Sequence, residues 1–274
     1  MTTNLLDGGE LRLNFLQSYY TDVGIKRRMN QDSLAIFKAD TDKGEVVFAL
    51  VCDGMGGYQY GELASKTIIE AFEKWFKLQL PYSLYKELST EQLRMNWENI
   101  VRQCNKELIS YGAKYGIELG STLTAGLFIE NHYYIIHVGD SRAYEITTEG
   151  VSQITEDQSL VAEELRKGLL SEEEAKKDKR NNILLECVGI TPRVNILFYD
   201  GTIKERATYL FCSDGFWHET SDEEYIRYLS GNQFENNKMI RMQLNYLVEA
   251  CKQRGEKDNI SVVGLIPFKE KKDE

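Results

Sequence analysis

The stretch VVFALVCDGMGGYQYGELAS (residues 46–65) joins an apolar run to a glycine-rich turn and the start of a helix, with Asp53 at the junction. Asp-Gly alone is an ordinary hairpin signal. The segments YYIIHVGD and ATYLFCSDG place Asp140 and Asp214 beyond further apolar runs, and DNISVVGLI places Asp258 just before one. Because loops at strand ends build binding sites, the four aspartates, rather than the turns, are the feature to explain.

The chemistry of these aspartates depends on whether they converge. If they are unrelated turn residues, they carry no site. If they converge, a positive partner is needed to offset the cost of grouping buried carboxylates. The donor set would then be all oxygen, with no histidine or thiolate nearby, which favours magnesium or manganese over zinc or copper. A shared aspartate such as Asp53 could bridge two ions that activate water for attack on a phosphoryl group.

The composition limits the classes of function. The 274 residues are 42% hydrophobic and carry a formal net charge of −10, which argues against a general affinity for nucleic acid or anionic membrane, although a local basic patch stays open. We find no secretory signal in MTTNLLDGGELRL, and the apolar runs are shorter than the ~20 residues of a membrane-spanning helix. Five cysteines without CxxC spacing are expected to be buried reduced thiols, so we expect a cytoplasmic protein.

Several β-branched and aromatic runs bounded by Gly, Asn or Asp predict strands, with a tight hairpin at ENHYYI. No linker or repeat divides the chain, so we expect one domain over residues 1–274 with a short charged tail at 269–274. Strands in runs with helices grouped between them predict an α+β fold with antiparallel sheet. The expected strands are 13–21, 33–39, 45–52, 121–130, 132–139, 142–147, 194–200, 207–213 and 259–268.

Amphipathic stripes predict the helices. One begins near Gly61, a second covers residues 97–109, and a third covers 240–251 and ends at a cap on Gly255. We interpret these stripes as faces that pack on the core. Capping-box spacing marks two more helix starts, Ser171 with Glu174 and Ser221 with Glu224.

Other catalytic chemistries find less support in the residues. GGYQYGE (residues 56–62) has the glycine spacing of a P-loop, but Glu62 stands where the lysine must be and would repel phosphate. A Ser-His-Asp hydrolase lacks its G-x-S-x-G elbow. The basic segment GIKRRMNQDS (residues 24–33) offers Arg27, whose planar fork suits phosphate, although alone it would be a solvated turn. The three histidines, His132, His137 and His218, are expected to be structural or exposed.

Six motifs occur in an order that resembles the metal-dependent protein Ser/Thr phosphatases of type 2C, in their compact bacterial form. They are TDVGIKRRMNQDS, DGMGGYQYGELAS, GSTLTAGLFIENHYYIIHVGDSRAYEI, ITEDQSL, FCSDGFW and DNISVV, and the resemblance runs over about residues 13–268. The family implies a central sandwich of two antiparallel sheets with pairs of helices on its outer faces, a four-layer α-β-β-α arrangement. Residues 160–182 resemble its flap, a mobile element beside the active site, and the residues themselves read as a polar helix-loop-helix.

The resemblance implies a catalytic metal centre with two magnesium or manganese ions. Asp53 resembles the bridging carboxylate, the Gly54 carbonyl would bind the first ion, and Asp214 and Asp258 would complete the second site. Asp140 resembles the residue that, with Asp214, holds a third ion in bacterial members.

Three further residues match positions that handle phosphate and water. Arg27 matches the phosphate-binding arginine, with Arg28 as its natural control. Gln31 and Asp32 resemble groups that orient metal-bound water.

The implied function is hydrolysis of phosphoserine and phosphothreonine in proteins by a metal-activated water. Phosphorylated proteins would be the substrates, and a Ser/Thr kinase would oppose the enzyme. Two alternatives are a pseudophosphatase that binds phosphoproteins as a regulator, and a phosphatase dedicated to one protein. All four aspartates are present, which favours an active enzyme.

The chain departs from the family in places that concern substrate contacts and rate. Met55 stands where animal members carry a histidine proposed as a general acid, and methionine cannot donate a proton. Gln158 stands where the T-x-D-H-S motif usually has histidine. The segment NILLECVG lacks the usual Thr-Arg, and the flap lacks its His-Pro.

Overall fold

The computed structural model describes residues 11–42, 44–56, 60–86, 89–175 and 177–271. Its main sheet has ten strands in the order β10-β7-β6-β3-β1-β12-β11-β8-β9, with β2 paired to β3. The strands are β1 (Leu11–Asp22), β2 (Ser33–Thr41), β3 (Gly44–Cys52), β6 (Leu123–Ile129), β7 (His132–Val138), β8 (Arg142–Ile146), β9 (Val151–Gln153), β10 (Leu197–Thr202), β11 (Thr208–Cys212) and β12 (Ile260–Lys271).

The sheet differs from the expected pair of separate antiparallel sheets. The half formed by β2, β3, β6, β7 and β10 joins the half formed by β1, β8, β9, β11 and β12 through one parallel contact, Leu13 with Gly44. All other pairings in the main sheet are antiparallel. The predicted α+β class is confirmed, and the pairing is antiparallel except where β1 and β3 meet at one end and join the strands into one mixed sheet.

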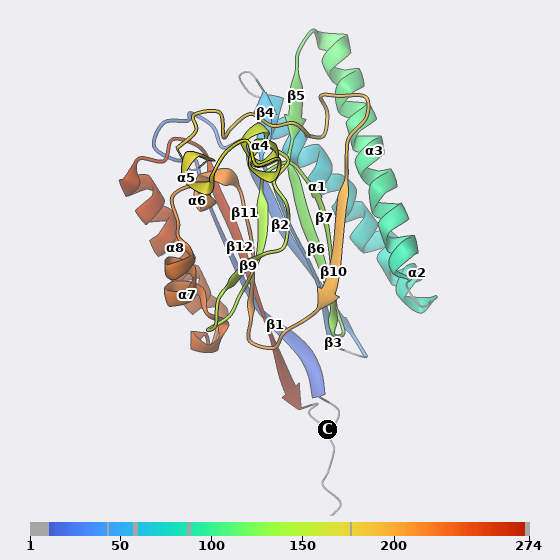
Figure 1. Ribbon diagram of the computed structural model, residues 1–274. Coiled ribbons are helices and arrows are strands. Elements are labelled where there is room, and N and C mark those ends of the chain that lie inside the picture. Colours follow the sequence, from blue (N-terminus) through green and yellow to red (C-terminus); the bar gives the residue numbers. More distant parts are fainter. Residues whose placement is uncertain (1–10, 43, 57–59, 87–88, 176, 272–274) are drawn as a thin grey trace, which may run out of the picture.

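The helices gather in two groups on opposite sides of the strands (Figure 1). One group has α1 (Tyr60–Leu78), α2 (Leu80–Tyr85) and α3 (Thr90–Tyr115), and the other has α7 (Asp222–Leu229) and α8 (Asn237–Arg254). The short helices α4 (Leu160–Arg166), α5 (Glu172–Ala175) and α6 (Asp214–Trp217) lie in the loops at one end of the strands. A 3-10 turn, η1 (Gly231–Gln233), separates α7 from α8. Two small strands, β4 (Gly54–Gly56) and β5 (Leu119–Ser121), pair with each other.

The apolar run of β3 is buried on both faces. Val46, Phe48 and Leu50 pack with the residues of α1 and α3, whereas Val47 and Ala49 pack between the two halves of the sheet. Side chains of a strand alternate between its faces, so each face meets its own apolar cluster. A third cluster lies between α7, α8 and the strands β8, β11 and β12. The burial of β3 on both faces explains why its sequence is continuously apolar instead of alternating between apolar and polar residues.

Local signals in the sequence placed most elements. Every expected strand region contains a strand, and the hairpin at ENHYYI turns between β6 and β7. The capping box at Ser221 is present, Ser171 and Glu174 exchange the same two bonds, and Gly255 ends α8 in the left-handed conformation (φ 99°). The five cysteines are free and buried, as expected. The helix expected over 97–109 is α3, which is longer than predicted, and the short helix α2 was not predicted. Among the described residues, no helix has the length and apolar character needed to cross a membrane.

Candidate active site

The strand register brings the predicted site residues to one end of the sheet. The last residue of β3 pairs with Ser33 at the start of β2, so Asp32 and Asp53 flank the same pair. The end of β11 pairs with the start of β8 and with β12 near its start. Asp140, Asp214 and Asp258 follow or precede these strand ends by two residues or fewer. Segments far apart in the sequence therefore meet at this end.

Asp53 lies at the electrostatic centre of this group. Burial raises its pKa well above the usual range, and the charges of Asp32, Asp214, Asp258 and Asp140 raise it further. Its backbone is held by Thr122, whose hydroxyl accepts from the Asp53 N–H (2.9 Å). Burial is the largest cause of this shift, and the surrounding charges add to it because they are of the same sign.

Among the residues that the structure describes, two buried carboxylate oxygens of the group have no hydrogen-bond partner, Asp32 Oδ1 and Asp214 Oδ1. Asp32 is 8% exposed and accepts from the Ser213 hydroxyl (2.9 Å) through its other oxygen. Burial raises the pKa of Asp32 to about 7, against hydrogen bonds that lower it. Burial also raises the pKa of Asp214. Unpaired buried carboxylate oxygens are costly, so both atoms indicate a missing positive partner.

Asp258 has a cation within the chain. The Arg27 Nε and Nη2 atoms donate to its two carboxylate oxygens at 2.9 and 2.5 Å, a bidentate pair. The Arg27 side chain is 51% exposed, so the pair lies at the mouth of the group. Hydrogen bonding to Asp258 raises the pKa of the guanidinium. The residue predicted to bind phosphate thus contacts a residue predicted to bind metal.

The loop that carries Arg27 is shaped by Asn259. Its side-chain amide donates to the Val23 and Met29 carbonyls (2.9 and 3.0 Å), and its oxygen accepts from the Gln31 N–H (2.8 Å). Gly24 (φ 75°) lies so close to the Asp258 carbonyl that a β-carbon there would stand 2.1 Å from the oxygen. The sequence reading missed the role of Asn259, although its place in the DNI motif was a signal.

Gly54 packs backbone to backbone against the start of α1. The absent side chain of Gly61 leaves room for the Gly54 carbonyl oxygen, which lies 2.5 Å from where a β-carbon of residue 61 would stand. Gln31 lies in the same contact, and its carbonyl accepts from the Ser65 hydroxyl (2.7 Å). The glycines of the opening stretch thus let the helix, the turn and the Arg27 loop approach one another. Gly57 of this stretch lies outside the described residues.

Asp140 is 4% exposed and lies in a turn held from three sides. The Trp217 indole donates to its carbonyl (3.0 Å). The preceding residue, Gly139, exchanges hydrogen bonds with Gln158. Burial, the largest cause, and the charges of Asp214 and Asp157 raise the pKa of the Asp140 carboxyl well above its usual range.

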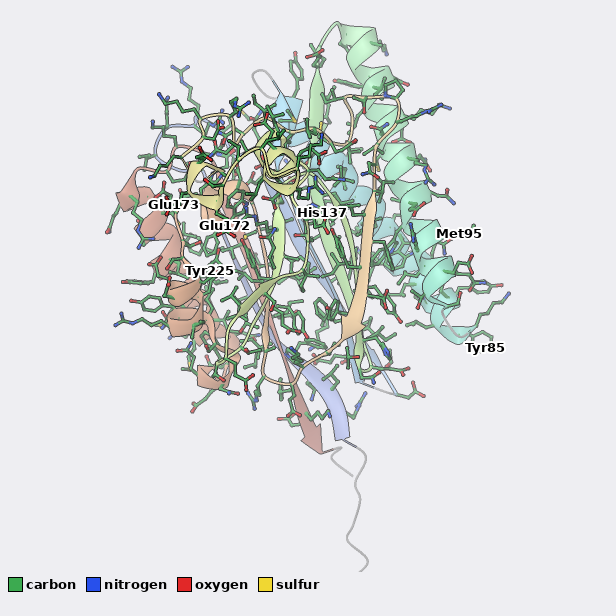
Figure 2. The ribbon with its side chains drawn as sticks, in the orientation of Figure 1. Tyr85, Met95, His137, Glu172, Glu173 and Tyr225 are labelled. Carbon is green, nitrogen blue, oxygen red and sulfur yellow. The ribbon has the colours of Figure 1, made fainter. Side chains whose placement is uncertain are left out.

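His137 supports the same turn and is structural, as expected. Figure 2 shows it in the interior, below the loops at the end of the strands. Its Nε2 lies 3.0 and 3.1 Å from the carbonyls of Gly139 and Glu156, which places the proton on that nitrogen, and Nδ1 contacts the Thr124 hydroxyl (2.9 Å). Burial lowers the pKa of His137 to about 4, so the ring is neutral at physiological pH.

A second histidine corrects the expectation that none lies near the aspartates. His218 follows Asp214 by one helical turn, and its charge lowers the pKa of that carboxyl, against the larger effect of burial. Its Nε2 is buried without a hydrogen-bond partner. The i, i+4 spacing from Asp214 was the signal that the sequence reading did not use.

The departures from the family pattern fall in different places. Met55, two residues after Asp53, is exposed. Gln158 is buried beneath the Asp140 turn. This position does not support the expectation of a direct effect on substrate contacts. Within residues 160–182, α5 is acidic with no buried residue, whereas α4 buries Val161 and is less polar than expected. Arg180 binds Glu164 across the two segments (2.7 and 3.1 Å).

The donor chemistry fits a magnesium or manganese centre. The candidates are carboxylate oxygens and one backbone carbonyl, which these hard ions prefer, and among the described residues the Asp214 Oδ1 atom is unpaired. Within the part of the chain that the structure describes, no three His, Cys, Asp or Glu side chains already form a group that could hold a metal ion. The Arg27–Asp258 pair occupies both oxygens of one proposed ligand.

Comparison with known proteins places the chain among phosphatases. Residues 25–224 match the family model described as protein phosphatase 2C. The serine/threonine phosphatase stp of Listeria innocua is 29% identical over 248 residues, which cover 89% of this chain and 93% of the relative.

Solved structures agree in fold. The serine/threonine phosphatase Stp1 from Staphylococcus aureus superposes with a TM-score of 0.79 at 28% identity, covering 94% of this chain and 96% of that one. The catalytic domain of the phosphatase PstP in complex with two manganese ions gives a TM-score of 0.76 at 26% identity, covering 93% and 99%.

Proposed function

The chain belongs to the protein phosphatase 2C family of metal-dependent serine/threonine protein phosphatases, and we propose that Asp53, Asp214 and Asp258 form its catalytic metal centre. The observation that carries this assignment is the buried oxygen of Asp214, which has no hydrogen-bond partner among the described residues, together with Asp53, whose pKa is raised by burial and by neighbouring carboxylates. A divalent cation would satisfy both at once.

Two ions would be held by this set, as the two manganese ions of the PstP structure suggest. Asp53 would be shared, the Gly54 carbonyl would contact one ion, and Asp214 and Asp258 would contact the other. A third ion would be held by Asp140 with Asp214. When bound, the ions would supply a Lewis-acid centre that makes a water molecule nucleophilic near neutral pH.

The chain's own residues would position the phosphoryl group. Arg27 would exchange the Asp258 carboxylate for phosphate oxygens, because a planar guanidinium fits either in the same bidentate manner. Its exposure at the mouth of the site leaves it accessible to a phosphoprotein. Gln31 and Asp32 would orient the attacking water, with Asp32 held by Ser213. The leaving oxygen needs a proton from elsewhere, since Met55 has none to give.

The wider assignments follow from the family and the fold. We interpret the two halves of the curled sheet and the two helix groups as the four layers of a single domain over residues 1–274, with the flap at 160–182. The substrates would be phosphorylated proteins, and a Ser/Thr kinase would oppose the enzyme. Five free, buried cysteines are consistent with a reducing cytoplasmic compartment.

The test is hydrolysis of p-nitrophenyl phosphate and of phosphoserine and phosphothreonine peptides with manganese, magnesium, calcium or EDTA. We expect activity with manganese or magnesium, none in EDTA, and at least a thousandfold lower kcat in Asp214→Ala. Asp200→Ala is the matched control, because Asp200 is exposed on β10, away from the strand ends that carry the site. A folded protein that binds manganese but cleaves neither ester would support the pseudophosphatase alternative instead.

A further inference from the structure

Gln158 uses every polar group it has to join two parts of the molecule. The residue is 4% exposed. Its side-chain oxygen accepts from the Gly139 N–H (2.8 Å), and its backbone N–H donates to the Gly139 carbonyl (2.7 Å). Its side-chain amide donates to the Asn195 carbonyl (2.9 Å), and its own carbonyl accepts from the Leu185 N–H (2.8 Å). Through these four hydrogen bonds, one buried residue connects the backbone at Gly139 with the backbone at Leu185 and Asn195.

The first two contacts clamp the residue immediately before Asp140. Gly139 adopts φ 108°, and a β-carbon there would lie 2.7 Å from a Thr122 methyl carbon. The turn therefore depends on glycine and has no side chain of its own to hold it in place. Both polar groups of the Gly139 backbone are bound by Gln158, so the glutamine sets the direction in which the chain enters Asp140.

The other two contacts hold a strap, which we define as residues 183–195. Gln158 binds it at Leu185 and Asn195, near its two ends. Within the strap, the Asn195 N–H donates to Glu186 (3.0 Å), and Val188 exchanges backbone bonds with Ser121 (2.9 Å each). Leu185 and Ile190 of the strap are exposed. The strap and the Asp140 turn are thus tied to the same buried side chain.

An amide suits this position chemically. It presents an acceptor to the Gly139 N–H and a donor to the Asn195 carbonyl at the same time, and it does so at every pH. A thioether such as methionine has similar length but can make neither bond well. A carboxylate keeps the acceptor but loses the donor.

We propose that Gln158 is a positioning residue that holds Asp140 in its metal-binding orientation and ties that orientation to the strap. The role of Asp140 as a ligand rests on the proposed function. Gln158 touches no reacting atom in this arrangement. It acts through its two hydrogen bonds to the Gly139 backbone. A partner or substrate that moves the strap would therefore move Gln158 and, through these two hydrogen bonds, Asp140.

The first test needs no metal. Amide hydrogen exchange of Gly139, followed by NMR in the metal-free protein, should be about tenfold faster in Gln158→Met, because one buried hydrogen bond is lost. It should change little in Gln158→Glu, which keeps the acceptor. The Val263 amide in β12 reports global unfolding, so a variant that is merely less stable would accelerate both amides equally, and that result would contradict the proposal. Gln103→Met, on the exposed face of α3, is the control.

The second test is calorimetric titration with Mn²⁺. Gln158→Met should lower the Mn²⁺ affinity of the sites that depend on Asp140 by about tenfold and leave the affinity of the remaining sites unchanged. Asp140→Asn should have the larger effect on the same sites. An isotherm identical to wild type, together with unchanged Gly139 exchange, would overturn the proposal. If Asp140→Asn itself leaves the isotherm unchanged, the metal assignment of Asp140 fails, and so does the metal-positioning part of this inference, whereas a faster Gly139 exchange would still support the clamp.

Discussion

Two groups of buried carboxylates in this chain are balanced in opposite ways. Asp157 is paired with Arg142, whose Nη2 and Nε atoms donate to it at 2.6 and 2.9 Å, and the guanidinium stacks 3.3 Å over the Trp217 ring. Glu145 is likewise paired with Lys204 (2.7 Å) and bound by the Tyr209 hydroxyl (3.0 Å). Each of these carboxylates has its cation within the chain, and its role is to hold the structure together.

The group at the strand ends lacks such compensation. Asp140 and Asp214 are buried and Asp53 is half-buried. Burial and neighbouring carboxylates raise the pKa of Asp53 and of Asp140, and Arg27 donates only to Asp258 among the described hydrogen bonds. The same residue type in the same fold thus serves two purposes, and the difference lies in whether a cation is built in. A cation that the chain does not supply must come from solution, which is the physical basis for a metal centre.

The largest expected effect comes from replacing one aspartate of each group with asparagine and comparing the two variants. Asp53→Asn should lower kcat at least a thousandfold while leaving the metal-free protein as stable as wild type or more so, because it removes a crowded charge. Asp157→Asn should lower the free energy of unfolding by about 3 kcal/mol, because it leaves Arg142 buried without its partner. Urea unfolding and kinetics with saturating manganese measure both. Equal loss of stability in the two variants would contradict the distinction.

The second prediction concerns pH in the absence of metal. The pKa of Asp32 is raised to about 7, above its unfolded value, so its contribution to stability is present at low pH and is lost as pH rises through about 7. Asp53 and Asp140 act in the same direction. The pKa of His137 is lowered to about 4, so it opposes this only below pH 6.5.

Above pH 6.5 the metal-free protein should therefore lose stability by about 1.4 kcal/mol per pH unit for each carboxyl still protonated in the fold. Thermal unfolding in EDTA at several pH values measures the slope. Mn²⁺ should abolish or reverse it, because the ion replaces the protons. Asp32→Asn should flatten the slope, and Asp200→Asn should not. A metal-free protein that gains stability from pH 6.5 to 8 would show that the group is compensated after all.

The smallest expected effect contrasts two adjacent arginines. Arg27→Ala should lower kcat/KM by about a hundredfold, because a donor to the developing charge on the phosphoryl group is lost. Arg28→Ala should change it less than about threefold, since Arg28 is exposed and makes no hydrogen bond or ion pair with the aspartates among the described contacts. Steady-state kinetics with a phosphopeptide decides between them. Similar losses in both variants would indicate a diffuse basic surface instead of a bidentate phosphate contact.

The sequence predicted the local elements well. Hydrophobic periods of two and 3.6 residues depend only on neighbours in the chain, and so do the glycine and capping residues that end an element. For this reason β3, α8 and the capping box at Ser221 could be predicted from the sequence. The order of the six motifs indicated the family, which the family model then confirmed. The site residues followed from the same motifs and stay a prediction for direct test.

What only the tertiary structure decided are the contacts between distant segments. Arg27 and Asp258 are 231 positions apart, and their pairing depends on how the loop before β2 folds against the turn before β12. Nothing in ITEDQSL shows that Gln158 would bind both Gly139 and Asn195, because those bonds need the register of three separate segments. The single parallel contact that joins the sheet halves is of the same kind. The sequence by itself determined which elements form and which residue types they carry, since those depend on local periodicity and turn chemistry. The packing of those elements decided which carboxylates received a partner within the chain and which did not, since charge compensation depends on distance in space.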